Sequence, residues 1–125
     1  MRTLLLTRHA KSSWDDPWQS DFDRPLNARG ERDAPTMAER FVRRGLPPPL
    51  LVSSTARRAW RTALAFADAL GIPERAIVAM PKAYHAVEDT LLDIVNTLPD
   101  DAATVMLFGH NPGISGFAYD LCGAT

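Results

Sequence analysis

Residues Thr3–Arg8 read TLLLTR and are followed directly by His9. An apolar run of this length with polar residues at its ends is typical of a buried strand. The run Thr104–Phe108 (TVMLF) has the same character, and it leads through Gly109 into a second histidine, His110. We therefore predict two buried strands from distant parts of the chain, each with a histidine just beyond its end.

Between these runs the sequence alternates between strand and helix patterns. Leu50–Ser53 and Ala76–Met80 predict two more short strands. Apolar residues at helical spacing predict a helix after every strand, over about residues 27–44, 54–70, 86–98 and 114–121. The resulting order indicates an α/β fold, a three-layer sandwich in which helices cover both faces of a mostly parallel sheet.

Single residues refine the first predicted helix. Asn27 is expected to cap it. Its buried face is predicted to carry Ala34, Met37, Ala38 and Phe41. Pro35 is unfavourable inside a helix, so this helix is expected to begin near Pro35 or to end its first turn before it.

The later helices carry similar signals. Ser54 or Thr55 is the expected cap of the second helix, and Gly71 is its expected end. The third predicted helix turns five apolar residues inward, namely Leu91, Leu92, Ile94, Val95 and Leu98. Cys122 is expected to be a small buried side chain.

The composition is that of one globular domain over residues 1–125. The chain is 46% apolar and 23% charged, which is typical of soluble proteins and argues against disorder. No apolar run is long enough to span a membrane, and the first residues lack the pattern of a signal peptide. A cytoplasmic protein without membrane association is therefore expected. A single cysteine, Cys122, excludes an intrachain disulfide and a multi-cysteine metal site.

The charges are distributed unevenly along the chain. The formal net charge of −1 gives no support for nucleic-acid binding. Residues 1–62, however, carry twelve basic and seven acidic side chains, and twelve of the fourteen basic residues in the chain are arginine. Arginine suits the bidentate capture of phosphate or carboxylate groups. Most of these arginines are expected on solvated helix faces, and those at strand ends are candidates for a binding site.

The ends of three predicted strands hold such candidates. In a parallel sheet, ligands bind at the carboxyl ends of the strands. The first strand ends in Arg8-His9, the second leads into Arg57 and Arg58, and the fourth leads into His110. Each piece is weak by itself, because a lone histidine or a Gly-His-Asn-Pro-Gly turn is common. Together they predict an anion site, and phosphate is the ligand that best matches several donors.

Four short motifs extend this prediction to a family. They are Leu6–Ser12 (LTRHAKS), Asp23–Gly30 (DRPLNARG), Ser54–Thr62 (STARRAWRT) and Gly109–Pro112 (GHNP), and they span the chain. With this set of motifs in this order, the sequence resembles the histidine phosphatase superfamily, which has the phosphoglycerate-mutase-like fold. Within that superfamily it is most similar to the small SixA-type phosphohistidine phosphatases.

The resemblance implies a role for each residue at the strand ends. His9 would be the nucleophile that becomes phosphorylated, and His110 would be the second histidine of the pocket. Arg8 and Arg58 would bind the phosphoryl oxygens. Arg58 matches the spacing of the family motif better than Arg57 does.

The other roles are less defined. Lys11 and Ser12 are expected either to support the phosphate pocket or to have a structural role. No motif assigns the proton donor for the leaving group; the candidates are His85 and Glu88, and Glu88 also fits a simple N-terminal helix charge. No metal or other cofactor is implied, because two arginines and a second histidine can neutralise the phosphoryl charge.

Three functions remain open at this point. A neutral imidazole is a competent nucleophile near pH 7. The leading expectation is therefore a metal-independent hydrolase of phosphoric monoesters or phosphoramidates, with a phosphohistidine intermediate and a phosphohistidine-bearing protein as substrate. The alternatives are a phosphatase or mutase for a small phosphorylated metabolite, and a non-catalytic phosphate-binding module. The resemblance also implies at least one further strand, so the domain is expected to be incomplete at its C-terminus.

Overall fold

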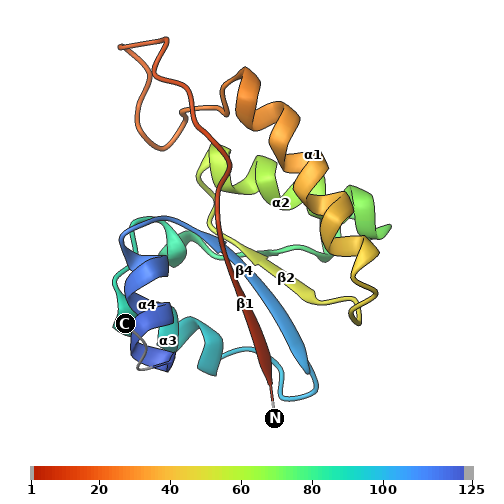
Figure 1. Ribbon diagram of the computed structural model, residues 1–125. Coiled ribbons are helices and arrows are strands. Elements are labelled where there is room, and N and C mark those ends of the chain that lie inside the picture. Colours follow the sequence, from red (N-terminus) through yellow and green to blue (C-terminus); the bar gives the residue numbers. More distant parts are fainter. Residues whose placement is uncertain (1, 123–125) are drawn as a thin grey trace.

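Four parallel strands form one open sheet in the computed structural model, which describes residues 2–122 (Figure 1). The strands are β1 (Thr3–Arg8), β2 (Leu50–Ser53), β3 (Val78–Ala79) and β4 (Thr104–Gly109). Their order across the sheet is β1-β4-β2-β3, and every neighbouring pair is parallel. The predicted α/β class is therefore confirmed. β3 is shorter than predicted, because Glu74–Ala76 before it forms a 3-10 turn, η1.

The helices form a layer on each face of the sheet, as predicted. α1 (Ala28–Arg43) and α2 (Arg57–Leu70) pack together over one face (Figure 1). α3 (Glu88–Asn96) and α4 (Gly113–Cys122) pack together over the other. A short 3-10 turn, η2 (Pro81–Ala83), precedes α3. Burial of these apolar helix faces against the sheet is the main force that holds the layers together.

The strand β4 shows why the sheet needs both layers. Side chains of a strand alternate between the two faces of its sheet. Val105 and Leu107 belong to the core shared with α3 and α4, and Met106 and Phe108 belong to the core shared with α1 and α2. All four side chains are buried. A continuous apolar run of this kind fits a strand that is covered on both sides.

The strand register brings three residues to one edge of the sheet. β1 and β4 end in register, so His9 and His110 follow them at the same level. The amide of His9 donates to the carbonyl of Gly109 at 3.2 Å, and the amide of Ser54 donates to the carbonyl of Phe108 at 3.0 Å. His9, Ser54 and His110 therefore lie at the carboxyl edge, where parallel sheets bind their ligands.

The long segment between β1 and α1 is fastened to the first turn of α1. Asn27 caps the helix, as predicted, and its side chain accepts from the amide of Gly30 at 2.8 Å. The amide of Asn27 donates to the carbonyl of Lys11 at 2.9 Å. A β-carbon on Gly30 would lie 2.2 Å from that same carbonyl oxygen, so the close approach requires glycine. The beginning of the loop is thereby held beside the sheet edge.

The prediction for Pro35 was wrong, because α1 runs through it without a break. Pro35 and Glu31, whose carbonyl loses its usual N–H partner, are both exposed, so water can replace that hydrogen bond. Ala34 and Ala38 are buried as predicted, and their packing supports the helix on both sides of the proline. Met37, which was also predicted to be buried, is 51% exposed because it lies off that face.

Three further predictions need correction. The N-cap of α2 is Ala56, so neither Ser54 nor Thr55 caps it; the Ser54 hydroxyl instead accepts from the amide of Ala56 at 3.2 Å. Leu92 is exposed, because the buried face of α3 is formed by Leu91 and Ile94. Cys122, at the end of α4, is exposed as well.

Two expectations concern the membrane and the end of the chain. Within residues 2–122, no helix combines the length and the apolar character that a membrane crossing needs. The strand expected after the last helix would follow residues 123–125, which lie outside the described residues.

Candidate active site

The carboxyl edge of the sheet opens into a cavity of about 530 Å³. This volume lies within the range of small-molecule sites. Its lining includes His9, His85, five cationic side chains and two carboxylates; the charged residues are Arg8, Lys11, Arg24, Arg29, Arg58, Asp21 and Asp33. The surplus of positive charge favours an anionic ligand.

The ring of His9 has one nitrogen that carries a lone pair. Its Nδ1 lies 2.7 Å from the carbonyl oxygen of Ala10. A carbonyl oxygen only accepts, so Nδ1 carries the proton, and in the neutral ring Nε2 holds the lone pair. The Nε–H of Arg58 donates to this Nε2 at 3.3 Å. The nitrogen with the lone pair therefore faces a deeply buried arginine.

The surroundings of His9 keep its ring neutral near pH 7. Partial burial lowers its pKa below 6.5, because burial penalises the charged form. The hydrogen bond to the Ala10 carbonyl opposes this effect. Positive charges lower the pKa further, in the order Arg58, Arg8 and Arg24. A nucleophilic imidazole requires a shift in this direction, because only the neutral ring has a lone pair.

Arg58, in the first turn of α2, is 2% exposed. A buried guanidinium needs partners for its N–H groups. Its Nη1 donates to the backbone carbonyl of Asp21, and its Nη2 donates to Oδ2 of the same residue at 3.1 Å. Arg57, by contrast, is exposed, and its Nη1 reaches the carbonyl of Asp23. Of the two neighbouring arginines, Arg58 is the one that the fold places in the cavity.

His110 lies beside His9, with 5.2 Å between the ring centroids. Its Nε2 is 2.8 Å from the hydroxyl of Ser54, and its buried Nδ1 has no partner within residues 2–122. The Ser54 hydroxyl accepts from Ala56, and its own hydrogen can be donated to Nε2. Burial, above all, lowers the pKa of His110 to about 3, so its ring is neutral at pH 7. When Ser54 donates to Nε2, the proton of the ring lies on Nδ1, which is then a buried donor without an acceptor among residues 2–122.

The cavity of His9 is also lined by Arg8, Lys11 and Ser12, whereas His110 lines a neighbouring cavity of about 280 Å³. Arg8, the last residue of β1, is exposed and takes part in none of the ion pairs found within residues 2–122. Lys11 and Ser12 follow in the loop. The hydroxyl of Ser12 accepts from Nη1 of Arg24 at 2.7 Å. The Arg24 guanidinium also lies 3.6 Å from the ring centroid of Trp14, which supports it by a cation–π contact.

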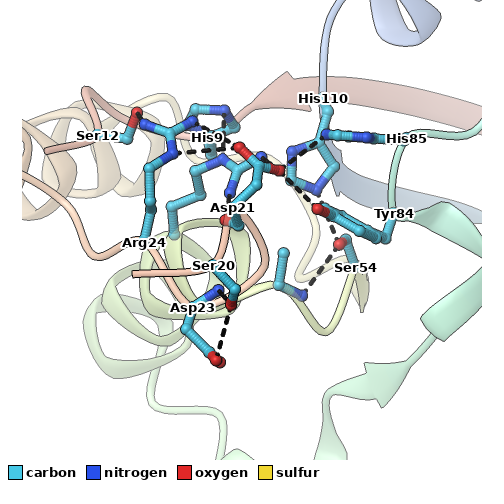
Figure 2. Close-up of polar contacts among 12 residues, drawn as sticks. His9, Ser12, Ser20, Asp21, Asp23, Arg24, Ser54, Tyr84, His85 and His110 are labelled. Atoms are coloured by element: carbon cyan, nitrogen blue, oxygen red, sulfur yellow. Dashed lines mark hydrogen bonds and ion pairs between the residues drawn. The ribbon is translucent and has the colours of Figure 1, made fainter. Parts of the chain in front are cut away.

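Asp21 is the side chain on which several donors converge (Figure 2). Its Oδ2 accepts from the Tyr84 hydroxyl and from Arg58, and it lies 3.1 Å from Nε2 of His85. Its Oδ1 accepts from Nε and Nη2 of Arg24 at 3.2 and 3.1 Å. The Tyr84 hydroxyl first, and then the two arginines, hold the pKa of Asp21 well below its ordinary value. Asp21 is therefore a carboxylate at neutral pH.

The two candidate proton donors occupy different places. His85 lines the same cavity as His9, and its ring stacks on Tyr84 with 4.1 Å between centroids. Its backbone φ of 51° lies in the left-handed region, which residues other than glycine rarely adopt. Glu88 lies in the first turn of α3 and lines a neighbouring cavity of about 280 Å³. Of the two candidates, His85 is the one that borders the cavity of His9.

Comparison with known families connects this geometry to an established group. The sequence profile of the Histidine phosphatase superfamily (branch 1) matches residues 4–80, a segment that includes His9 and Arg58. The chain belongs to this superfamily. The other histidine of the site, His110, lies beyond the matched segment, and the parallel pairing of β1 and β4 brings it beside His9.

Solved structures similar to this chain share its fold. A protein from Agrobacterium tumefaciens that bears the name phosphohistidine phosphatase SixA is 36% identical and has a TM-score of 0.84, over 94% of this chain and 73% of that one. A protein histidine phosphatase SixA in complex with tungstate has a TM-score of 0.82 at 21% identity, over 94% of this chain and 75% of that one. The second likeness concerns the fold alone.

Curated relatives extend across almost the whole chain. An uncharacterized chloroplastic protein of Arabidopsis thaliana is 36% identical over 132 residues, which cover 99% of this chain and 61% of that protein. An uncharacterized protein of Mycobacterium tuberculosis is 38% identical over 112 residues, which cover 89% of this chain and 66% of that protein. The chain thus spans less than two thirds of the length of these curated relatives.

Sequence motifs located the sheet edge that carries the candidate site but missed several side chains that build it. Asp21 is one of four aspartates in the loop over residues 10–24, and no spacing distinguishes it from the others. Tyr84 reaches the site only through the tertiary fold. Ser54 was interpreted as a helix cap, although its position directly after a strand was a signal that could have placed it in the site.

Proposed function

We propose that this chain carries the active site of a metal-independent phosphatase, which transfers a phosphoryl group to His9 and then to water, with protein phosphohistidine as its substrate. The observation that carries the proposal is the ring of His9. Its Nδ1 donates to the Ala10 carbonyl, so Nε2 holds the lone pair, and Arg58 donates to that lone pair a hydrogen bond which the attack on phosphorus would replace. An activated nucleophile next to a fixed cation is the arrangement that phosphoryl transfer needs.

In the first step, the lone pair of His9 Nε2 attacks the phosphorus. The bond between phosphorus and the leaving group breaks, and its electron pair goes to the leaving-group atom, which takes up a proton. Negative charge is spread over the three phosphoryl oxygens. Arg8 and Arg58 would bind two of them, and Nδ1–H of His110 would bind the third. The bound oxygen would then be the acceptor that this buried donor lacks.

In the second step, water attacks the phosphorus of phospho-His9. The bond between phosphorus and Nε2 breaks, its electron pair returns to the ring, and the proton lost by the water passes to phosphate or solvent. The Ala10 carbonyl keeps the other proton on Nδ1 throughout, so the ring returns to its starting state. The protein contributes position and charge, which are the main requirements of this chemistry.

His85 is better placed than Glu88 to give a proton to the leaving group. It lines both the cavity of His9 and the neighbouring one, whereas Glu88 lines the neighbouring cavity alone. The carboxylate of Asp21, 3.1 Å from Nε2 of His85, orients its ring in the way that carboxylates orient functional histidines. We therefore propose His85 as the proton donor and assign Glu88 to the charge of the α3 N-terminus.

The proposed substrate class follows from the leaving group. Within residues 2–122, the carboxylates that line the cavity are Asp21, which is held ionised, and Asp33, which pairs with Arg29 at 3.4 Å. Neither is suited to protonate an alkoxide, so an alkyl monoester would depend on His85 for a proton. A phosphohistidine ring that already carries a proton on its other nitrogen needs none, because the electron pair of the broken bond returns to the ring and imidazole leaves as a neutral group. Similarity to a protein that bears the name phosphohistidine phosphatase supports the same substrate class.

We expect the protein to hydrolyse a phosphohistidine peptide about a hundredfold faster, in kcat/KM, than an alkyl phosphate monoester. The measurement is release of inorganic phosphate from both substrates under identical conditions. Equal rates would contradict the phosphohistidine assignment and favour a phosphatase for a metabolite. Binding of phosphate without turnover of either substrate would favour a non-catalytic module.

Activity is expected to fall in acid, with a midpoint below pH 6.5. The pKa of His9 is lowered from 6.5, and protonation removes the attacking lone pair. The rate therefore stays high as the pH drops toward 6.5 and is lost only at lower pH. The pH dependence of kcat/KM should be measured with two substrates whose phosphoryl groups have different pKa values. The midpoint of the acid loss will be the same for both substrates if it comes from a group of the protein. A flat rate down to about pH 4 would contradict His9 as nucleophile.

A further inference from the structure

Asp21 has an unusually large number of hydrogen-bond and ion-pair partners for a carboxylate on a loop. Its side chain is 38% exposed, yet it contacts donors from three separate segments. They are Arg24 of the same loop, together with Tyr84 and His85 of the segment before α3 (Figure 2), and Arg58 of α2. A carboxylate with so many hydrogen-bond partners has a fixed position, so its role depends on which of those partners it positions.

The contacts with Arg58 determine how its guanidinium faces His9. Asp21 accepts from Nη1 with its backbone carbonyl and from Nη2 with its side chain. Two hydrogen bonds to one residue prevent the planar guanidinium from rotating. The remaining edge of the group, Nε–H, is then directed to Nε2 of His9 at 3.3 Å. Asp21 thus sets the direction of the donor that lies beside the attacking nitrogen.

The charge of Asp21 limits which roles it can have. The Tyr84 hydroxyl and Arg58 keep it ionised at neutral pH, so it cannot serve as the proton donor. Its negative charge remains near the place where a phosphoryl group would bind, because both would contact the same guanidinium. Like charges in such proximity repel each other. Asp21 therefore has two effects of opposite sign on a phosphorylated substrate.

We infer that Asp21 is a positioning residue for phosphoryl transfer, which orients Arg58 beside the attacking nitrogen of His9 and at the same time weakens the binding of the anionic substrate. This inference rests on the proposed function, since it requires transfer of a phosphoryl group to His9. Removing the charge of Asp21 should slow turnover and tighten anion binding. A residue that only stabilises the loop would affect both in the same direction.

The test compares Asp21→Asn with Asp23→Asn, a matched change two residues away. The carboxylate of Asp23 accepts from the Ser20 hydroxyl at 2.9 Å, and it is not among the groups that line the cavity. For Asp21→Asn we expect kcat on a phosphohistidine peptide to fall by about 10- to 100-fold. The Kd for inorganic phosphate should fall by about three- to tenfold. Asp23→Asn should match the wild type in both measurements.

The outcomes separate this inference from the function on which it rests. With an active wild type, unchanged or faster turnover in Asp21→Asn overturns the inference alone. Weaker phosphate binding together with slower turnover also overturns it, because a disturbed loop would produce that pair of changes. A wild type without turnover overturns the proposed function, and the inference with it.

A second variant keeps the test decisive if Asp21→Asn does not fold. Asp21→Glu retains the charge but displaces the carboxylate from Arg58. We expect slower turnover with phosphate affinity close to that of the wild type. Wild-type turnover in a folded Asp21→Glu protein would show that the position of the carboxylate does not matter, and it would overturn the inference.

Discussion

Replacing His9 with alanine is expected to lower kcat/KM by about a thousandfold or more, while inorganic phosphate still binds. The loss is large because no other group in the cavity combines a lone pair at neutral pH with a position beside Arg58. Phosphate binding survives because Arg8, Arg58 and the Nδ1–H of His110 would still donate to the anion. The measurements are steady-state turnover and calorimetric titration with phosphate.

Retained phosphate binding is also the control for folding in His9→Ala. The ring of His9 is only half-buried, so its removal leaves the core of the sheet intact. Turnover within about tenfold of the wild type would contradict the role of His9, because direct attack by water would then account for most of the rate. Loss of both turnover and phosphate binding would point to a collapsed pocket rather than to a missing nucleophile.

Replacing Arg58 with alanine is expected to lower kcat/KM by about a hundred- to a thousandfold. Arg58 is the buried cation nearest to the attacking nitrogen, and it also pairs with Asp21. Its loss removes a donor for the phosphoryl oxygens and leaves Asp21 short of a partner, so the melting temperature should fall as well. Phosphate binding should weaken in this variant, unlike in His9→Ala.

Two further variants test whether the loss in Arg58→Ala depends on the geometry and the position of this arginine. Arg58→Lys keeps the charge, but the three N–H groups of an ammonium share one nitrogen and cannot reproduce the planar fork by which the guanidinium spans Asp21 and His9, so most of the activity should stay lost. Arg57→Ala removes the neighbouring exposed arginine, and it should have turnover close to that of the wild type. Equal losses in Arg57→Ala and Arg58→Ala would contradict the assignment of Arg58 to the cavity.

Local patterns were sufficient to predict the main elements and the edge of the sheet that carries the site. The strand β1 coincides with the predicted run, and β4 extends the predicted one by a single residue. Both strands have an uninterrupted apolar centre, Leu4–Leu6 in β1 and Val105–Phe108 in β4, because both faces of the sheet are covered. Such a run can be recognised in the sequence alone. The parallel arrangement predicts His9 and His110 at the same edge of the sheet, and the observed pairing of β1 with β4, which local patterns do not contain, brings them side by side.

Features that depend on tertiary contacts could not be predicted in the same way. α1 continues through Pro35 because Ala34 and Ala38 pack in the core on either side of it, and local propensity does not contain that packing. The side chain of Asp21 is positioned by contacts with Arg58, Tyr84 and His85, which lie 37 to 64 positions further along the chain. A loop with four aspartates offers no periodicity that could single out one of them.

The central claim is that His9 receives the phosphoryl group, and rapid quench tests it most directly. The protein is mixed with a phosphohistidine peptide, stopped in alkali within the first turnovers, and analysed by mass spectrometry for its site of phosphorylation. We predict a phosphate on His9 that is stable in base and labile in acid, and that is absent from the His9→Ala variant. Turnover without a phosphorylated protein, or with the phosphate on any other residue, would contradict the account.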